Sequence, residues 1–326
     1  MPLLVSGAEV KKILKMDDCI NLMEKVFIAL QKGQSIQPFR QAMWLPDKNG
    51  LLGTMPAFDG NSKMNGIKVV SVFLDNHAKG LSSHQGVVLL FESETGALIS
   101  IQDAEEITAI RTAAVSGVAT KILANPESET LAILGSGVQA GTHLEAITNV
   151  RPIKKVNIWS RNNGHAITFI EKHQNRFKVE LKSYDDITEA VANADIICTT
   201  TSAREPLLDL DQVKPGVHIN AVGACTPNVR ELGADLVTRS KLFTDSIESL
   251  INEAGDFIIP SREGRFDETL IQAELGEVLT GVKEGRKDPH SITLFESLGI
   301  GVEDVACADF IFKSATALSL GTNITL

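Results

Sequence analysis

The chain has 326 residues, of which 43% are hydrophobic, and its formal net charge is −10. This length exceeds the usual size of one hydrophobic core, so we expect two domains. The acidic balance, without any block of lysines and arginines, argues against nucleic-acid binding, because neutralising phosphates requires clustered basic residues.

The sequence also argues against a membrane protein and against a metalloprotein. No apolar run approaches the roughly 20 residues of a membrane-spanning helix, and the N-terminus lacks the layout of a signal peptide. The four cysteines are far apart in the sequence, with no CxxC pair and no His-rich partner segment. This spacing indicates neither a zinc site nor a disulfide framework. We therefore expect a soluble, cytoplasmic protein with reduced thiols and no bound metal.

The first third of the chain mixes helix and strand patterns. Residues 17–33 place apolar side chains on one helical stripe, with Asp17 or Asp18 as the N-cap and Gly33 as the stop. Extended segments follow at 40–45 ("RQAMWL"), 66–74 ("GIKVVSVFL") and 86–93 ("GVVLLFES"). The mixture predicts an α+β domain. A long helix then begins at Asp103, with Glu106 in capping-box position, and we expect it to link two domains.

From Thr130 onwards, strand and helix patterns alternate. Strands are expected at 130–137, 155–160, 179–184, 195–201, 218–224, 241–246 and 292–297, and helices at 139–148, 166–173, 187–194 and 302–320. Such alternation predicts a parallel sheet with helices on both faces. We expect a substrate and dimerisation domain formed by residues 1–115 with 303–326, and a dinucleotide-binding domain formed by residues 116–302.

The turn after the first of these strands fits the pattern G-x-G-x-x-[G/A]. It reads Gly135, Ser136, Gly137, Val138, Gln139, Ala140. In this pattern the first glycine permits a tight turn, the second lets a pyrophosphate approach the backbone, and the small last residue allows close packing of helix on strand. Glycine turns also occur for structural reasons alone. Here the preceding apolar strand and the alternating series that follows favour a Rossmann-type doubly wound α/β fold.

The end of the next strand bears on which dinucleotide binds. An NAD site usually has an acidic residue there, which binds the ribose hydroxyls. This chain has "NIWSRN", in which Ser160, Arg161 and Asn162 offer donors and one positive charge suited to a 2′-phosphate. The alternative is that Arg161 is a solvated loop charge. We therefore expect NADPH as the preferred cofactor, with NADH possible.

Three basic residues before the glycine turn lie among apolar neighbours. Strand alternation puts Lys68 on an apolar face, Arg111 shares a helical stripe with Ile107, and Arg40 opens a strand. A buried cation requires an anionic partner. Taken singly, each cation could be structural. Together they predict a site that holds a substrate carboxylate, and Arg111 with the neighbouring Thr112 is expected to contact cofactor as well.

Four other side chains are weaker candidates. His84, in the polar segment "LSSHQG", could donate a proton or could be a loop histidine with local hydrogen bonds. Cys225 has no evident general base beside it, which argues against a nucleophile. Glu253 and Asp256, in "EAGDFIIP", could be site residues or solvated charges at a helix end.

Several motifs together resemble the ornithine cyclodeaminase/μ-crystallin family, over nearly the whole chain from about Arg40. They are "GIKVVSVF", "SSHQGVVLLFE", "ITAIRTAAVSGVATKILA", "LGSGVQA", "WSRN", "INAVGA" and "ESLGIGVEDVA". The resemblance implies an NAD(P)-dependent homodimer whose first domain carries the substrate contacts. It assigns Arg40, Lys68 and Arg111 to the substrate carboxylate. Its cofactor contacts match Ser136, Gly137, Val138, Gln139, Ser160, Arg161, Asn162, Thr199, Ser297, Leu298 and Gly299.

Two departures separate this chain from the cyclodeaminases of the family. Cys225 stands at the position that matches their catalytic aspartate, and Gly53 or Thr54 stands at the position that matches a glutamate of theirs. The pattern is therefore more similar to the imine-reductase branch. We expect reduction of a cyclic imino acid, in the first place Δ1-pyrroline-2-carboxylate to L-proline, with Lys68 or His84 as proton donor. Ornithine cyclodeaminase, alanine dehydrogenase and a non-catalytic protein that binds NADPH and a small ligand remain alternatives.

Overall fold

A computed structural model describes residues 1–46, 50–73, 76 and 79–325. It divides into two compact units, Met1–Arg111 with Gly299–Leu326, and Thr112–Leu298. The division falls within the long helix α3 (Ala104–Leu123). Asp103 accepts a hydrogen bond from the Glu106 amide at 2.8 Å, which confirms the predicted start of this helix.

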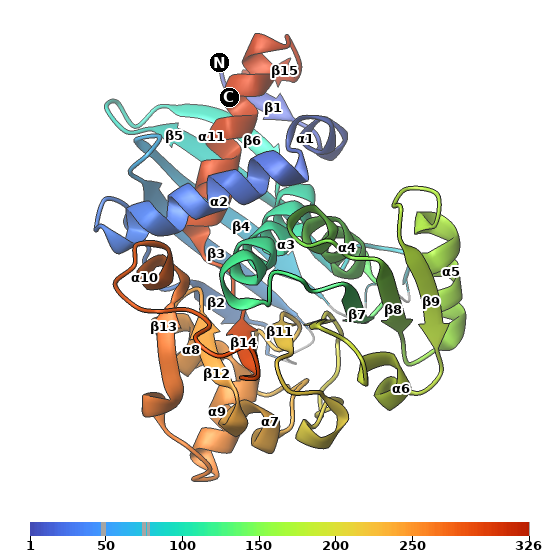
Figure 1. The fold of residues 1–326 in the computed structure, drawn as a ribbon. Helices are drawn as coiled ribbons and strands as arrows, with labels where there is room; N and C mark the ends of the chain where they lie inside the picture. Colours follow the sequence, from blue (N-terminus) through green and yellow to red (C-terminus); the bar gives the residue numbers. More distant parts are fainter. Residues whose placement is uncertain (47–49, 74–75, 77–78, 326) are drawn as a thin grey trace. The chain divides into compact units, whose positions relative to one another are not determined.

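In the described part of the first unit, seven strands form one mixed sheet in the order β15-β1-β6-β5-β4-β3-β2 (Figure 1). They are β1 (Leu3–Val5), β2 (Gln41–Trp44), β3 (Leu51–Asp59), β4 (Met64–Val72), β5 (His84–Glu92), β6 (Leu98–Asp103) and β15 (Thr322–Asn323). The pair β1 and β6 is parallel, and the other neighbours are antiparallel.

The predicted extended segments are confirmed as β2, β4 and β5, apart from Leu74, which lies outside the described residues. The strand β3 was missed because it contains Gly53 and Pro56. Proline lacks the amide hydrogen that an interior strand requires, so the sequence argues against a strand there. The ladder from β2 ends opposite Thr54. Pro56 therefore lies beyond the part of β3 that pairs with β2. Its lack of an amide hydrogen removes no backbone hydrogen bond between these two strands.

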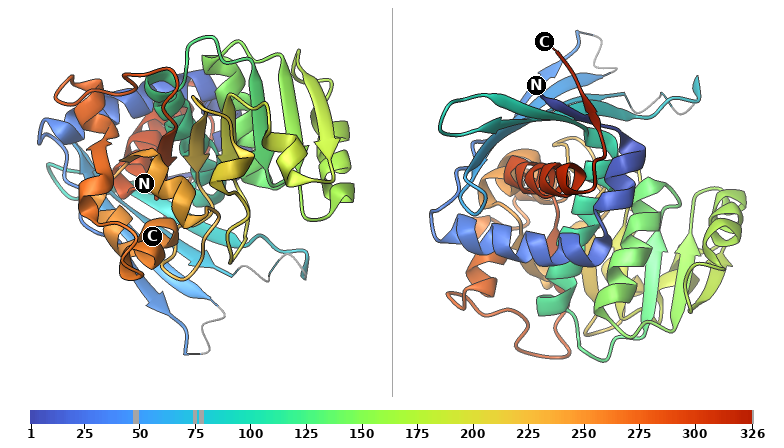
Figure 2. Two further views of the ribbon diagram at one scale, coloured as in Figure 1. Left: turned by 60° about the horizontal axis from the view of Figure 1, so that its bottom comes forward. Right: turned by 90° about the horizontal axis from the view of Figure 1, so that it is seen from above.

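The helices α1 (Gly7–Ile13), α2 (Met16–Gln31) and α11 (Gly301–Ala317) also belong to the first unit. Both views show α11 lying between the sheet and α2 (Figures 1 and 2). Contact is close, because a Cβ atom added to Gly66 of β4 would lie 2.7 Å from the Val305 side chain of α11.

The predicted stripe of α2 is confirmed, but its predicted N-cap is wrong. Ile20, Met23 and Phe27 are buried, and Gly33 has the positive φ of +66° expected just past a helix end. The N-cap is Lys15 rather than Asp17 or Asp18. Burying the side chain of Met16 in the core extends the helix further than the capping preference of aspartate predicts.

In the second unit, the described residues form an eight-stranded sheet in the order β13-β12-β14-β11-β10-β7-β8-β9, and all of its neighbours are parallel. The strands are β7 (Thr130–Leu134), β8 (Lys155–Trp159), β9 (Glu180–Tyr184), β10 (Ile196–Thr199), β11 (His218–Ala221), β12 (Lys241–Thr244), β13 (Ile271–Glu274) and β14 (Thr293–Glu296). This confirms the predicted parallel sheet, to which β13 adds a strand that the sequence did not indicate.

Helices α4 to α10 and two 3-10 turns connect these strands. They are α4 (Val138–Val150), α5 (Asn163–His173), α6 (Ile187–Val191), α7 (Ala234–Arg239), α8 (Ile247–Glu253), α9 (Gly255–Arg262), α10 (Leu275–Leu279), η2 (Leu210–Gln212) and η3 (Glu268–Leu270). Alternate residues of β7 enter two different apolar clusters, Ala132 and Leu134 in one, Leu131 and Ile133 in the other. The sheet is therefore covered on both faces, which is the doubly wound architecture.

Chain order reverses between β7 and β10, since β8 and β9 follow β7 on one side and the later strands follow on the other. In open parallel sheets, ligands bind at the carboxyl ends of the strands beside such a reversal. None of the helices in the described residues is long and apolar enough to span a membrane.

Candidate functional site

The glycine turn at the end of β7 has the geometry of a pyrophosphate-binding turn. Gly135 has φ +118°, and a Cβ atom there would lie 2.6 Å from the Thr200 carbonyl oxygen, so only glycine fits. Gly137 is the N-cap of α4 and supplies no side-chain cap, and a Cβ atom added to it meets nothing within 4 Å. At such a helix N-terminus the helix dipole favours an anion.

The segment after β8 carries the donors expected beside the adenosine ribose. The Ser136 hydroxyl donates to Ser160 Oγ at 3.2 Å, which joins the glycine turn to this segment. Arg161 is exposed. Asn162 caps α5, accepting from the Gly164 amide at 2.9 Å. The residues present fit a nicotinamide dinucleotide, whose pyrophosphate would be held by Gly135, Gly137 and the first turn of α4.

Thr199, at the end of β10, is fully buried, and its hydroxyl donates to Glu231 Oε2 at 2.6 Å. Glu231 also accepts from the Thr201 amide, the Thr201 hydroxyl and the Gly223 amide at 2.6 to 2.8 Å. One carboxylate therefore fixes the loops that leave β10 and β11. The sequence drew attention to Thr199 but not to Glu231.

Three more carboxyl groups are buried near Glu231 in the second unit. They are Asp245 after β12, Asp256 in the first turn of α9, and Glu296 at the end of β14. Asp256 is fully buried and accepts from the amides of Glu231 and Leu232 at 2.9 and 2.8 Å. The interpretation of Asp256 as a solvated charge is therefore wrong, because these two amides need a buried acceptor.

The four carboxyl groups affect one another's ionisation. Burial, followed by repulsion from Asp256, Glu231 and Asp245, raises the pKa of Glu296 well above its ordinary value. Burial raises the pKa of Asp256 to about 8. Burial also raises the pKa of Glu231, but its four hydrogen bonds oppose that change. A carboxylate with four donors has no place for a proton, so we assign the proton of this cluster to Asp256 and Glu296.

Of the residues expected at the third cofactor segment, Ser297 and Leu298 are buried. Among the residues that the structure describes, the Ser297 hydroxyl has no hydrogen-bond partner. The Leu298 amide donates to Asp245 at 2.8 Å. An orphaned buried hydroxyl at the carboxyl end of β14 is consistent with a contact to a bound ligand. Thr112, on α3, is buried as well.

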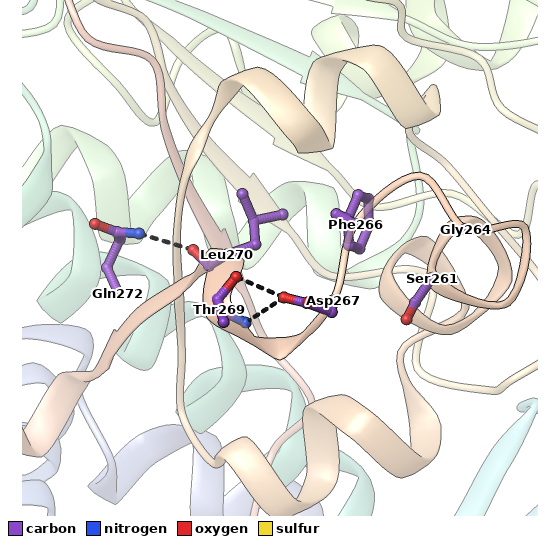
Figure 3. A pocket seen from close by; sticks show the side chains of 7 residues that line it. All are labelled: Ser261, Gly264, Phe266, Asp267, Thr269, Leu270 and Gln272. Carbon is purple, nitrogen blue, oxygen red and sulfur yellow. Dashed lines mark hydrogen bonds between the residues drawn. The ribbon is translucent and has the colours of Figure 1, made fainter.

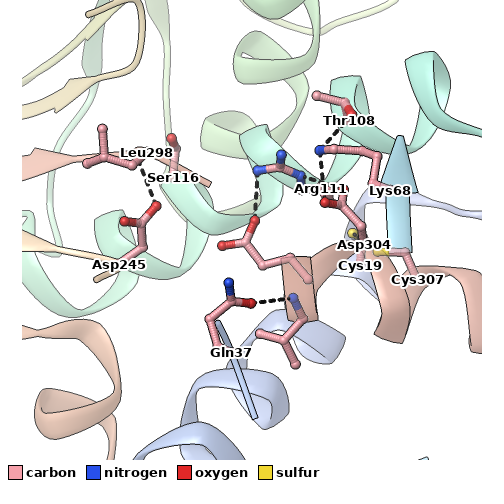
Figure 4. A network of polar contacts seen from close by, with 12 residues as sticks. Cys19, Gln37, Lys68, Thr108, Arg111, Ser116, Asp245, Leu298, Asp304 and Cys307 are labelled. Atoms are coloured by element: carbon pink, nitrogen blue, oxygen red, sulfur yellow. Dashed lines mark hydrogen bonds and ion pairs between the residues drawn. The ribbon is translucent and has the colours of Figure 1, made fainter. Parts of the chain in front are cut away.

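In the first unit, Lys68 and Arg111 lie together in a buried ion-pair cluster (Figure 4). Lys68 Nζ lies 2.8 Å from Asp304 Oδ2, and Arg111 Nε lies 3.1 Å from Asp304 Oδ1. Arg111 Nη1 lies 2.7 Å from Glu303 Oε2. The side chains of Glu303 and Asp304 are fully buried, and those of Lys68 and Arg111 are 3% and 5% exposed. The sequence required anionic partners for buried cations, and α11 supplies them for Lys68 and Arg111.

Lys68 has the environment of a proton donor. Burial, followed by repulsion from nearby Arg111, lowers the pKa of its ammonium group to about 8, and Asp304 opposes both effects. Among the described residues, its partners are Asp304 and the Thr108 hydroxyl, at 3.4 Å. An ammonium group has three donors, which leaves one for a ligand.

The other two candidates of the first unit lie at strand ends. Arg40 is half-buried and precedes β2 directly. His84 begins β5, two residues earlier than the predicted segment, and its Nδ1 lies 3.0 Å from the Ser83 hydroxyl. In the second unit, Cys225 is half-buried.

A surface pocket of about 670 Å³ in the second unit does not coincide with any of these residues (Figure 3). Its lining residues are Ser261, Gly264, Phe266, Asp267, Thr269, Leu270 and Gln272. The Asp267 carboxylate already accepts from the Thr269 amide and hydroxyl at 2.9 and 2.5 Å. Its hydrogen bonds therefore serve the local η3 turn, and we assign no chemistry to this pocket.

Fold and site define a dinucleotide-binding protein of the Rossmann type, whose first unit carries a buried cation cluster. The chain belongs to the ornithine cyclodeaminase/mu-crystallin family, whose model matches residues 2–319. It is 37% identical over 317 residues to the ketimine reductase mu-crystallin of Mus musculus, covering 96% of this chain and 97% of that protein.

Two solved structures share the whole fold. One is Δ1-pyrroline-2-carboxylate reductase of Thermococcus litoralis in complex with NADH and L-proline, with a TM-score of 0.97, 38% identity, and coverage of 99% of this chain and 100% of that one. The other is an archaeal alanine dehydrogenase dimer with bound NAD, with a TM-score of 0.94, 29% identity, and coverage of 100% and 99%.

Proposed function

We propose that this protein is an NAD(P)H-dependent reductase of cyclic imino acids, and that it converts Δ1-pyrroline-2-carboxylate to L-proline. The observation that carries the proposal is the buried pair Lys68 and Arg111, in a chain whose other unit has a dinucleotide-binding turn. The likeness to a reductase solved with NADH and L-proline supports the same substrate class.

The two cations have distinct parts in this reaction. The Arg111 guanidinium, held through Nε and Nη1, presents a fixed plane of donors to the substrate carboxylate. Lys68 offers its remaining donor to the same carboxylate or to the imine nitrogen. Arg40 is the third proposed carboxylate contact.

Reduction adds a hydride, supplied by bound NADH or NADPH, to the imine carbon and a proton to the imine nitrogen. A protonated imine is the better hydride acceptor, so a nearby acid speeds the reaction. With its pKa near 8, Lys68 is protonated at neutral pH and yet can release a proton. His84, acting through water, is the alternative donor.

We propose NADPH as the preferred form of the cofactor. The support is the segment Trp159–Asn162, which contains no acidic residue and carries the exposed Arg161. The two solved relatives named above were obtained with NADH and with NAD, so the preference is a property proposed for this chain.

We further propose that two copies of the chain associate through the sheet of the first unit. The face of the sheet opposite α11 bears a row of apolar side chains across four neighbouring strands, Pro56, Ile67, Leu89 and Ile101. All four are only partly buried in the single chain. An extended apolar face of this kind is typical of a subunit interface.

A substrate panel tests the reaction. The oxidation of NADPH and of NADH is followed by absorbance with pyrroline-2-carboxylate, with its six-membered homologue piperideine-2-carboxylate, and with pyruvate plus ammonia. Ammonia release from ornithine is measured in parallel. We expect the fastest turnover with pyrroline-2-carboxylate. Ammonia release from ornithine without imine reduction would overturn the proposal in favour of a cyclodeaminase, and binding without any turnover would favour a non-catalytic protein.

A further inference from the structure

The first turn of α11 brings two carboxylates to the proposed substrate cations. Asp304 contacts both cations, Lys68 at 2.8 Å through one oxygen and Arg111 at 3.1 Å through the other. The neighbouring Glu303 contacts Arg111 at 2.7 Å. Asp304 is thus the group that joins the two cations (Figure 4).

The backbone before α11 is built so that this turn can approach closely. Gly299 has φ +74°, and a Cβ atom there would lie 2.2 Å from Arg111 Nη1. A Cβ atom on Gly301 would lie 2.8 Å from the Met55 carbonyl oxygen. The Val302 amide also donates to Gln37 Oε1 at 2.8 Å. The two glycines of "SLGIG" therefore let Arg111 and β3 pack directly against the start of α11.

The start of α11 suits a carboxylate that pairs with these cations. Asp304 lies in the first turn of a 17-residue helix, where the helix dipole stabilises a negative charge. Among the described residues, the charged groups that act on Lys68 are Arg111 from α3 and Glu303 and Asp304 from α11. The buried thiols of Cys307 on α11 and Cys19 on α2 lie 3.8 Å apart, and Cys307 is close enough to Asp304 to be affected by its charge. Removing the charge of Asp304 would leave Lys68 facing Arg111 without the carboxylate that separates them.

We propose that Asp304 is a positioning residue, which fixes the spacing of Lys68 and Arg111 for the substrate carboxylate and keeps Lys68 in its protonated, proton-donating form. This inference rests on the proposed imine reductase function. It assigns to the segment "GIGVED" a role in the substrate site, apart from the cofactor contacts expected at Ser297 to Gly299.

Asp304→Asn tests this role against Glu303→Gln as the matched control. For each variant, kcat and KM for pyrroline-2-carboxylate are measured across pH, and the affinity for NADH is measured by fluorescence titration. We expect Asp304→Asn to raise KM about ten- to a hundredfold, the equivalent of one charge-assisted hydrogen bond. We also expect it to move the alkaline limb of the kcat profile to lower pH. Glu303→Gln should raise KM less and leave that limb in place, and NADH affinity should stay unchanged in both.

Asp304→Glu keeps the charge but lengthens the side chain. It is the variant to be measured if Asp304→Asn fails to fold. It should retain the alkaline limb of the wild type while raising KM. If Asp304→Asn kept both the KM and the pH profile of the wild type, or if Glu303→Gln shifted the limb equally, the role of Asp304 would be refuted. Absence of imine reduction by the wild type would instead refute the proposed function.

Discussion

Lys68 illustrates how the environment of one residue sets its chemistry. On a surface, a lysine holds its proton too tightly to act as an acid near neutral pH. Burial and Arg111 lower its pKa to about 8, while Asp304 limits the change. The result is a cation that can bind a carboxylate and still release a proton, which suits general acid catalysis at the pH of the cell.

Arg161 gives a prediction about the cofactor. Its exposed guanidinium follows β8, where the 2′-phosphate of NADPH would lie. We expect Arg161→Ala to weaken NADPH binding by about ten- to a hundredfold, the loss of one charge-assisted hydrogen bond, with little effect on NADH. Titration of both nucleotides, with Lys172→Ala on α5 as the control, checks this. Equal losses for the two nucleotides would remove the reason for proposing an NADPH preference.

At the scale of elements, the buried carboxyl groups at the end of β14 and in α9 should make the stability of the protein depend on pH. An acid whose pKa is raised on folding stabilises the folded state most below its unfolded pKa, and this contribution is lost as pH rises to the folded value. For Asp256 that window runs from the ordinary 3.8 to about 8. Above this window Asp256 loses its proton, which adds negative charge to a buried cluster.

Asp256→Asn should therefore flatten the decline in the free energy of unfolding between these two pH values. Asparagine can accept from the same two amides and offers an amide hydrogen where the acid holds its proton. The difference should reach a few kcal/mol at the alkaline end. Urea unfolding at several pH values, with the exposed Asp211→Asn as control, measures it. An unchanged slope for Asp256→Asn would show that this carboxyl does not hold the proton.

The sequence predicted the second unit better than the first, for physical reasons. Alternating apolar strands and helices, with the turn from Gly135 to Ala140, determine a parallel doubly wound sheet locally. In the first unit, β3 contains a glycine and a proline, and its strand conformation depends on partners elsewhere in the chain. A buried cation such as Arg111 likewise predicts that an anionic partner exists. The periodicity of apolar residues cannot reveal that Glu303 and Asp304, more than 190 residues away in the sequence, are the partners.

For the whole molecule, the apolar row on the sheet of the first unit predicts that the protein is a dimer. Leu89 pairs with Ile67 on one side and Ile101 on the other, in the middle of this row. Leu89→Lys would place a charge at the centre of the interface, at a cost of a few kcal/mol or more for an unpaired buried cation. We expect the wild type to sediment with twice the mass of one chain and the variant to dissociate.

Val282→Lys is the matched control, because Val282 is 62% exposed in the second unit and its replacement leaves the sheet untouched. It should remain dimeric. A monomeric wild type, or a dimer that survives Leu89→Lys unchanged at low concentration, would show that the copies do not associate through this face.

The most direct test of the central claim is a crystal structure of the protein with NADH and L-proline. We predict that the proline carboxylate lies within hydrogen-bond distance of Lys68 Nζ and of the Arg111 guanidinium, while Asp304 still joins the two cations. A proline carboxylate bound elsewhere, with Lys68 and Arg111 paired to Glu303 and Asp304 and to nothing else, would contradict the account.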